Sequence, residues 1–198
     1  MAGGIGSGKT TLATILGELG VGIVASDRLN HEELNAPEVL AVLRQWWGDR
    51  AIGPDGRADR GVIRRIVAGD DQARQRLEQL IHPRIARRRD ELMARYQADP
   101  RIRAVVWDSP LLFEVGLAGQ CDAVIFVEAD AQARLARVSC QRGWTAEDLE
   151  GFERLQKPLD FKRENADYTV VNNSDIDDLR RQAEDVFSRI LSGARQRG

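Results

Sequence analysis

The feature that most constrains this chain is the octet Gly-Gly-Ile-Gly-Ser-Gly-Lys-Thr at residues 3–10. A glycine, four residues and then Gly-Lys-Thr is the spacing of a phosphate-binding loop, or P-loop. Its glycines let backbone N–H groups approach a polyphosphate, and the helix that follows points its positive N-terminus at the anion. In this pattern Lys9 reaches the β- and γ-phosphates and the Thr10 hydroxyl binds Mg²⁺. A flexible Gly/Ser turn is the alternative, but a helix-like run follows the octet at once, as the motif requires.

Only Met1 and Ala2 precede this loop, although a P-loop is the turn between a buried strand and a helix. About five apolar strand residues are expected before it, and burying each such side chain is worth roughly 1.5–3 kcal/mol. A chain without them would be poorly stable. We therefore expect that the first strand is truncated and that the natural start lies a few residues upstream.

Composition narrows the class of protein. The 198 residues are 42% hydrophobic and 30% charged, which is enough to build a globular core, and the length favours one domain. A formal net charge of −2 excludes a broadly basic nucleic-acid binder, and no apolar run approaches membrane-spanning length. Cys121 and Cys140 match no metal or disulfide spacing and suit a reducing cytosol. We expect a cytoplasmic protein, a monomer or weak oligomer, with no nucleic-acid or membrane partner.

Strand-like and helix-like segments alternate, which predicts an α/β fold with a parallel sheet between helices, the three-layer P-loop NTPase architecture. Residues 1–198 then form a single domain with two additions. Helical patterns from about 31 to 97 predict a helical subdomain, in which His82-Pro83 is expected to separate two helices. An arginine-rich segment from about 134 to 163 is expected to be a lid, because a closing lid excludes water and its arginines neutralise phosphoryl charge.

Two aspartates follow predicted strands, at the end where ligands bind in an open α/β sheet. Asp27 comes just after the strand Val21–Ala25, where a helix N-cap is an equally good explanation for it. Asp108 ends the apolar strand 104–107, as a carboxylate near the Mg²⁺ of a P-loop enzyme does. Strands often end in Asp, so Asp108 indicates a metal site only in combination with the P-loop.

Arginines form two groups with two explanations each. In the helical block, Arg84 is the best candidate for phosphate binding, and the other members of its cluster fit a solvated helix face. In the lid segment, surface charge is the default explanation for any single arginine. The first group is Arg84, Arg87, Arg88 and Arg89, and the second is Arg134, Arg137, Arg142 and Arg154.

The P-loop indicates a nucleoside triphosphate and Mg²⁺, but it does not specify the reaction. The guanine-binding motif Asn-Lys-x-Asp is absent, which argues against a GTPase, and the chain is too short for a motor or helicase core with its own regulatory parts. A small-molecule kinase is the most economical interpretation. Two alternatives stay open: a kinase for another small acceptor, such as a nucleoside or nucleotide, and a non-catalytic nucleotide-binding regulator.

Five segments resemble dephospho-CoA kinases, in the order and at the spacing of that family. They are the octet at 3–10, Leu-Gly-Val-Gly-Ile-Val-Ala-Ser-Asp at 19–27, Leu-Ile-His-Pro-Arg-Ile at 80–85, Asp-Ser-Pro-Leu-Leu-Phe-Glu at 108–114 and Ala-Asp-Tyr-Thr-Val-Val-Asn-Asn-Ser at 166–174. The resemblance implies ATP-dependent phosphorylation of the ribose 3′-hydroxyl of dephospho-CoA, the last step of coenzyme A synthesis. It also implies a nucleotide-monophosphate-kinase-like core with a CoA-binding helical subdomain and a lid.

The resemblance further implies catalytic roles. Asp27 orients the acceptor hydroxyl and accepts its proton, while Lys9 and Arg142, with Arg163 next, stabilise the migrating phosphoryl group. His82 helps to hold the CoA moiety, although a packing histidine at a helix end is equally consistent with the sequence.

Two positions depart from the family pattern. The family usually has Thr where this chain has Ala2, and Asp-Ala-Asp where this chain has Ala25-Ser26-Asp27, so only the second acidic position is retained. The expected ATP site is Gly4, Ile5, Gly6, Ser7, Gly8, Lys9, Thr10, Thr11, Arg142 and Asn173; the expected dephospho-CoA site is Asp27, His82, Arg84 and Leu111; and the expected metal ligands are Thr10 and Asp108.

Overall fold

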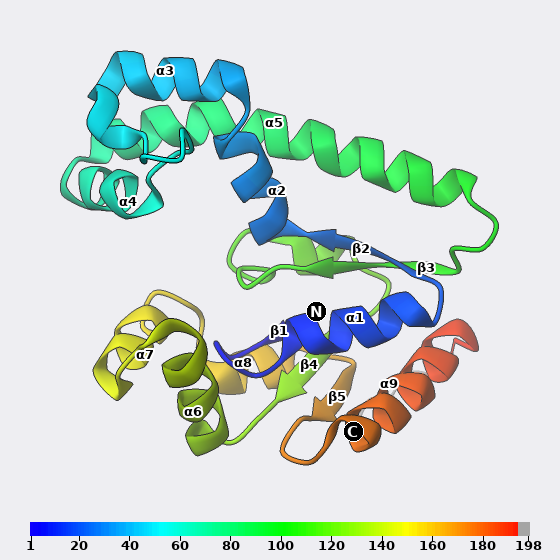
Figure 1. Ribbon diagram of the computed structural model, residues 1–198. Helices are drawn as coiled ribbons and strands as arrows, with labels where there is room; N and C mark the ends of the chain where they lie inside the picture. Colours follow the sequence, from blue (N-terminus) through cyan, green and yellow to red (C-terminus); the bar gives the residue numbers. More distant parts are fainter. Residues whose placement is uncertain (194–198) are drawn as a thin grey trace. The chain divides into compact units, whose positions relative to one another are not determined.

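The computed structural model describes residues 1–193, which fold into two compact units (Figure 1). Of the described residues, 1–23 and 100–193 form the first unit, and 24–99 form the second. Strands lie mainly in the first unit, whereas the second is built from helices.

Three strands of the first unit form a parallel sheet. They are β1 (Ala2–Gly3), β4 (Ile125–Glu128) and β5 (Tyr168–Val171), in the order β1-β4-β5. Ala2 is paired with Phe126, and Ile125 is paired with Tyr168. The first three residues of β4 are buried, as expected for a parallel strand covered on both faces.

A second, two-stranded sheet contains β2 (Val21–Ala25) and β3 (Ala104–Asp108). Along β2 the chain passes from the first unit to the second. The Met1 ammonium donates a hydrogen bond of 2.7 Å to the Trp107 carbonyl, which connects the start of the chain to β3. Parallel strands and covering helices confirm the predicted α/β architecture.

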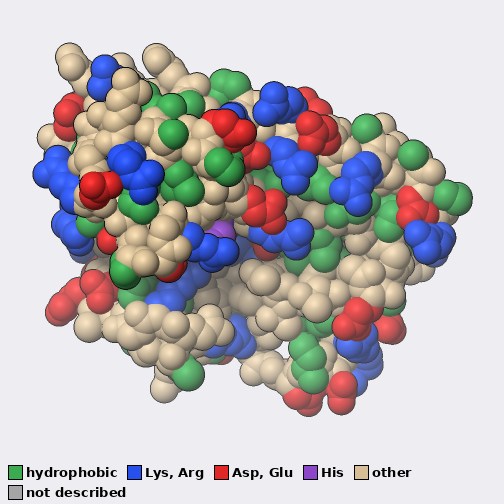
Figure 2. Space-filling view, turned by 45° about the horizontal axis from the view of Figure 1, so that its top comes forward, with side chains coloured by type: hydrophobic (Ala, Val, Ile, Leu, Met, Phe, Trp, Pro, Cys, Tyr) green, Lys and Arg blue, Asp and Glu red, His purple; other side chains and the backbone are tan. Residues whose placement is uncertain are grey.

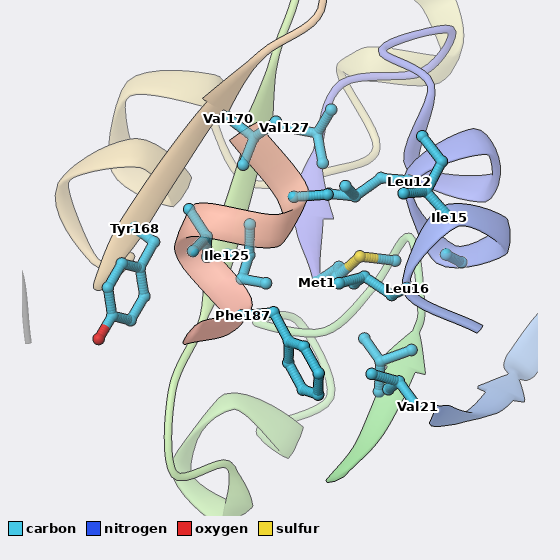
Figure 3. Packing of buried hydrophobic residues seen from close by; sticks show 14 of the residues in the cluster. Met1, Leu12, Ile15, Leu16, Val21, Ile125, Val127, Tyr168, Val170 and Phe187 are labelled. Carbon is cyan, nitrogen blue, oxygen red and sulfur yellow. The ribbon is translucent and has the colours of Figure 1, made fainter. Parts of the chain in front are cut away.

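Among the described helices of the first unit, two cover the strands through apolar stripes. Side chains of α1 and α9 meet those of β4 and β5 in one core, as Figure 3 shows for Leu12, Leu16, Val127, Val170 and Phe187. The helices of this unit are α1 (Lys9–Glu18), the short 3₁₀ turn η2 (Leu117–Gln120), α6 (Ala131–Arg142), α7 (Ala146–Glu153), α8 (Leu159–Glu164) and α9 (Ile176–Leu191).

The second unit has its own apolar core and clear helix-start signals. Pro37 is at the first position of α3, and the carboxylates of Asp59 and Asp70 accept hydrogen bonds from backbone N–H groups at the starts of α4 and α5. Its elements are α2 (Ser26–Leu34), α3 (Pro37–Trp47), the 3₁₀ turn η1 (Asp49–Ala51), α4 (Arg60–Gly69) and α5 (Asp71–Ala98), and its core includes Leu34, Val39, Leu43, Ile63 and Ile81.

The helix α5 corrects one prediction. It runs without interruption through His82-Pro83 for 28 residues, so the expected break at this dipeptide is wrong. Proline removes one backbone donor, but Ile81 and Ile85 on either side of it pack in the same core, and this packing holds both halves in register. Although α5 is long, no helix in the described part of the chain is both long and apolar enough to span a membrane.

Candidate active site

The P-loop connects β1 to α1, and its fixed glycines have a physical reason. Gly8 has a φ of 93°, in the left-handed region, and forms the N-cap of α1. A side chain at Gly8 would overlap the Asn172 amide, and one at Gly3 would place its Cβ 2.6 Å from the Val127 carbonyl oxygen. Neither Val127 in β4 nor Asn172 after β5 can retreat easily, so glycine is required at both ends of the motif.

Lys9 lies across its own loop. Its ammonium group donates to the carbonyl oxygens of Gly3, at 3.0 Å, and Gly4, at 2.8 Å. These contacts hold the positive charge over the first residues of the loop. The predicted contact of Lys9 with phosphates remains a prediction.

Thr10 and Asp108 are brought together from positions far apart in the sequence. The Thr10 hydroxyl donates to a carboxylate oxygen of Asp108 at 3.5 Å, because the first turn of α1 lies beside the end of β3. Hydroxyl and carboxylate oxygens are ligands that suit Mg²⁺. The donor set therefore fits the metal expected from the sequence.

Three further side chains bind the backbone of the loop. Arg134 donates to the Ile5 carbonyl at 3.4 Å, and Arg137 donates to the carbonyls of Gly6 and Ser7 at 3.2 and 3.4 Å. The Asn172 side chain donates to the Ser7 carbonyl at 2.8 Å. Arg134 and Arg137 lie one turn apart on α6, and this spacing is the signal by which the sequence could have placed both against one neighbour.

The two residues that sequence reasoning favoured over these, Arg142 and Asn173, have other partners. The Arg142 guanidinium lies 4.9 Å from the ring centre of Trp144, which in turn stacks on Phe152 with ring centres 4.4 Å apart. Asn173 accepts a hydrogen bond of 2.9 Å from the Asp130 N–H, before α6, whereas its neighbour Asn172 reaches the loop.

Arg163 lies beside the loop, at a cavity of about 140 Å³ that is also lined by Gly4 and Arg134. Its guanidinium is 3.4 Å from Glu128 and 3.1 Å from Asp160. The buried Arg134 is paired with Glu153 of α7. Several arginines of the predicted lid segment are thus held near the P-loop by carboxylates and carbonyls.

The segment 108–114 is fixed from behind by a buried lysine. Lys162 is 1% exposed, and its ammonium lies 2.9 Å from Glu114 and donates to the Pro110 carbonyl at 3.3 Å. Burial raises the pKa of Glu114, but hydrogen bonds from Lys162 and from the Lys157 N–H outweigh it and leave the pKa below its ordinary value. Within this segment Leu112 is buried and the predicted substrate residue Leu111 is 39% exposed.

The remaining predicted residues lie in the second unit. Asp27 is exposed in the first turn of α2, and Ala25 rather than Asp27 occupies the N-cap, so the capping explanation is wrong. His82 is exposed on α5. Arg84 donates to the buried carboxylate of Glu33 at 2.7 Å, an ion pair that joins α5 to α2.

Comparison with known proteins gives a consistent result. A family model described as dephospho-CoA kinase matches residues 1–178. A dephospho-CoA kinase of Corynebacterium glutamicum is 34% identical over 196 residues, covering 97% of this chain and 96% of the relative. One of Burkholderia thailandensis is 34% identical over 198 residues, covering 98% of this chain and 95% of the relative.

Solved structures agree. A crystal structure from Thermus thermophilus has a TM-score of 0.80 at 30% identity, covering 96% of this chain and 95% of that one. A dephospho-CoA kinase of Campylobacter jejuni, with a TM-score of 0.68 at 23% identity and coverage of 97% and 96%, supports the fold. The P-loop geometry, the family model and relatives of matching length lead to one conclusion: the chain belongs to the dephospho-CoA kinase family.

Proposed function

We propose that this chain transfers the γ-phosphoryl group of ATP to the ribose 3′-hydroxyl of dephospho-CoA, giving coenzyme A and ADP in the last step of coenzyme A synthesis. The observation that carries the proposal is the convergence of Lys9, Thr10 and Asp108 at one P-loop in a chain of this family. Such a loop binds the triphosphate through backbone N–H groups and the helix N-terminus.

On the donor side, the chain's own residues position the triphosphate. Lys9 exchanges its loop carbonyls for the β- and γ-phosphates, and Arg142 and Arg163 neutralise charge that develops during transfer. Thr10 directly and Asp108 through water are the residues we assign to Mg²⁺, which shields the phosphate oxygens when bound. Closure of the segment 134–163 excludes water, so that ATP is not hydrolysed in place of transfer.

On the acceptor side, Asp27 orients the 3′-hydroxyl and accepts its proton as the new P–O bond forms in line with the departing ADP. We assign His82, Arg84 and Leu111 to binding of the CoA moiety, and the helical segment 31–97 to the substrate subdomain. The exposure of Asp27 and His82 supports this assignment, because both side chains are accessible to a ligand.

The setting of the enzyme is part of the proposal. We assign it to the cytoplasm as a monomer or weak oligomer, without a nucleic-acid or membrane partner. Basic and acidic side chains are interspersed over the face shown in Figure 2, which supports a surface that does not select a polyanion. Sedimentation at several protein concentrations tests the oligomeric state.

An ADP-release assay with a panel of acceptors tests the function. Dephospho-CoA should stimulate ADP release, whereas AMP and nucleosides should not. Stimulation by AMP or a nucleoside instead would establish a kinase for another small acceptor. ATP binding without turnover on any acceptor would establish a nucleotide-binding regulator.

A further inference from the structure

Three consecutive carbonyl groups of the P-loop are held from outside the loop. The Ile5 carbonyl accepts from Arg134, and the Gly6 carbonyl accepts from Arg137. The Ser7 carbonyl accepts both from the Asn172 side chain, at 2.8 Å, and from Arg137. The loop therefore has an outer side that donors from α6 and from the end of β5 define.

These contacts determine where the N–H groups of the loop point. The C=O and N–H of a trans peptide point in opposite directions within one plane, and the described chain has no cis peptide bond. A carbonyl fixed on the outer side therefore turns the next residue's N–H toward the inner side, where an anion is cradled. The Ser7 carbonyl, which has two donors, sets the N–H of Gly8 in this way. The Gly6 carbonyl orients the N–H of Ser7, which closes the loop on the Gly4 carbonyl at 3.2 Å.

Asn172 joins the sheet, α6 and the loop. It is 8% exposed, and its N–H donates to the Glu128 carbonyl at 2.8 Å, which fixes it beside the end of β4. Its own carbonyl accepts from Arg137 at 2.8 Å, so the two side chains hold each other in place. Because Asn172 is anchored on strands, the loop geometry that it sets is tied to the sheet.

Arg137 also contributes charge. Arg134 is paired with the carboxylate of Glu153, whereas the partners found for Arg137 among the described residues are carbonyl oxygens. A guanidinium bonded only to neutral oxygens keeps its full positive charge, and this charge lies on the outer side of a loop that binds phosphate.

We propose that Arg137 and Asn172 are positioning residues of this kinase: acting through the carbonyls of Gly6 and Ser7, they aim the loop N–H groups and thereby set its affinity for nucleotide. The inference rests on the proposed binding of ATP at the P-loop. It does not require either side chain to touch the nucleotide.

The experiment compares Asn172→Ala, Arg137→Gln and Arg137→Lys with the unaltered protein, and uses Arg181→Gln, an exposed arginine on α9, as the matched control. Calorimetry gives the Kd for ATP and ADP with Mg²⁺ and without acceptor, kinetics give the KM for both substrates, and thermal denaturation verifies folding. We expect Asn172→Ala and Arg137→Gln to raise the Kd for ATP about tenfold, while the KM for dephospho-CoA changes by less than about twofold. Arg181→Gln should match the unaltered protein.

Two outcomes bear on the geometric part of the inference. Arg137→Lys keeps the charge but lacks the guanidinium fork that reaches three carbonyls, so its ATP affinity should lie between those of Arg137→Gln and the unaltered protein. An ATP affinity equal to that of the unaltered protein would show that charge alone matters and would overturn the geometric part of the inference. The double variant should be less impaired than the product of the single effects, because both side chains act on the Ser7 carbonyl.

Unchanged ATP affinity in folded Asn172→Ala and Arg137→Gln proteins, or equal losses for both substrates, would overturn the inference. Two variants are needed because Asn172 is buried and its replacement can lower the stability of the fold. Arg137 is only partly buried, so the Arg137→Gln protein still tests the inference if Asn172→Ala does not fold. Nucleotide binding is measured without acceptor, so the result stands even for a chain that fails to phosphorylate dephospho-CoA.

Discussion

In the first unit, Arg137 donates to backbone carbonyls of the P-loop, whereas in the second unit Arg84 is bonded to the buried carboxylate of Glu33. The sequence presents both as arginines on amphipathic helices. A carbonyl partner leaves the positive charge intact for an anion, but a carboxylate partner cancels it. Arginine clusters therefore identify an anion site only when the partner of each guanidinium is known.

The difference does not remove Arg84 from the proposed substrate site. A guanidinium has five N–H donors in a fixed plane, so an ion pair with Glu33 and a contact with a ligand are compatible. The contrast lies in what each arginine does for the fold: Arg84 joins two helices, and Arg137 shapes a loop. Four substitutions, two in each unit, test how the helical unit and the P-loop unit contribute to catalysis, nucleotide binding and stability.

The largest effect is expected from Asp27→Asn. The amide keeps the size of the side chain but cannot accept the acceptor's proton, so kcat should fall about 10²–10⁴-fold while ATP affinity stays unchanged. Single-turnover kinetics with ATP binding measured in parallel check this. A kcat close to that of the unaltered enzyme would exclude Asp27 from the chemistry and leave the second unit with binding alone.

Gly8→Ala should come next, because it strains the loop that the first unit holds so tightly. The backbone of Gly8 lies in the left-handed region and its Cβ would overlap Asn172, so ATP affinity should fall about 100-fold. Gly69→Ala in α4 is the matched control, since its Cβ meets open space and alanine favours helix. Calorimetric titration of ATP into both variants measures the two affinities. An ATP affinity of Gly8→Ala similar to that of Gly69→Ala would mean that the loop accommodates the added methyl group.

In the second unit, Glu33→Gln should cost about 1–3 kcal/mol of unfolding free energy, because it removes the buried carboxylate 2.7 Å from Arg84 and leaves only the exposed Glu38, at 3.4 Å, as its counter-charge. Glu32→Gln, one residue earlier in an exposed pair with Arg28, should cost less than about 0.5 kcal/mol. Urea denaturation measures both. ATP affinity should be unaffected by either, and a large change in it would contradict a structural role for the Glu33–Arg84 pair.

The smallest effect concerns pH. Because the folded protein holds the pKa of Glu114 below its ordinary value of 4.5, the Glu114–Lys162 pair stabilises the fold fully above pH 4.5 and loses that contribution as pH falls through the lowered pKa. Glu114→Gln should therefore be less stable near neutral pH and should lose less stability on acidification. Denaturation at several pH values compares the two slopes, and equal slopes would refute the assignment.

Local sequence patterns predicted much of the fold. The octet at 3–10 and the alternation of apolar runs with helical periodicity predicted the loop, α1 and the parallel sheet. The break expected at His82-Pro83 is absent because packing of Ile81 and Ile85 in one core overrides the local preference of proline. Tertiary packing, which local patterns do not contain, decides such positions.

The donors around the P-loop illustrate the same limit. The one-turn spacing of Arg134 and Arg137 could place both against one neighbour, but it does not say which neighbour. That choice, and the approach of Asn172, depend on how α6 and β5 fold against the loop. The sequence led us to expect Asn173 in the ATP site, and the side chain that contacts the loop is that of its neighbour Asn172. The roles of Asp27, His82, Arg142 and the other predicted site residues remain predictions.

The stack of Arg142, Trp144 and Phe152 has a practical consequence. A guanidinium over an indole is held by only about 0.5–1 kcal/mol at an exposed site, so Arg142 can leave it for a phosphate at little cost. Such a departure would alter the polarity around the ring and shift its fluorescence emission. Trp144 is thus an intrinsic optical probe of this contact, and in a chain whose other tryptophans are replaced by phenylalanine its emission would show whether Arg142 leaves the ring when ATP binds.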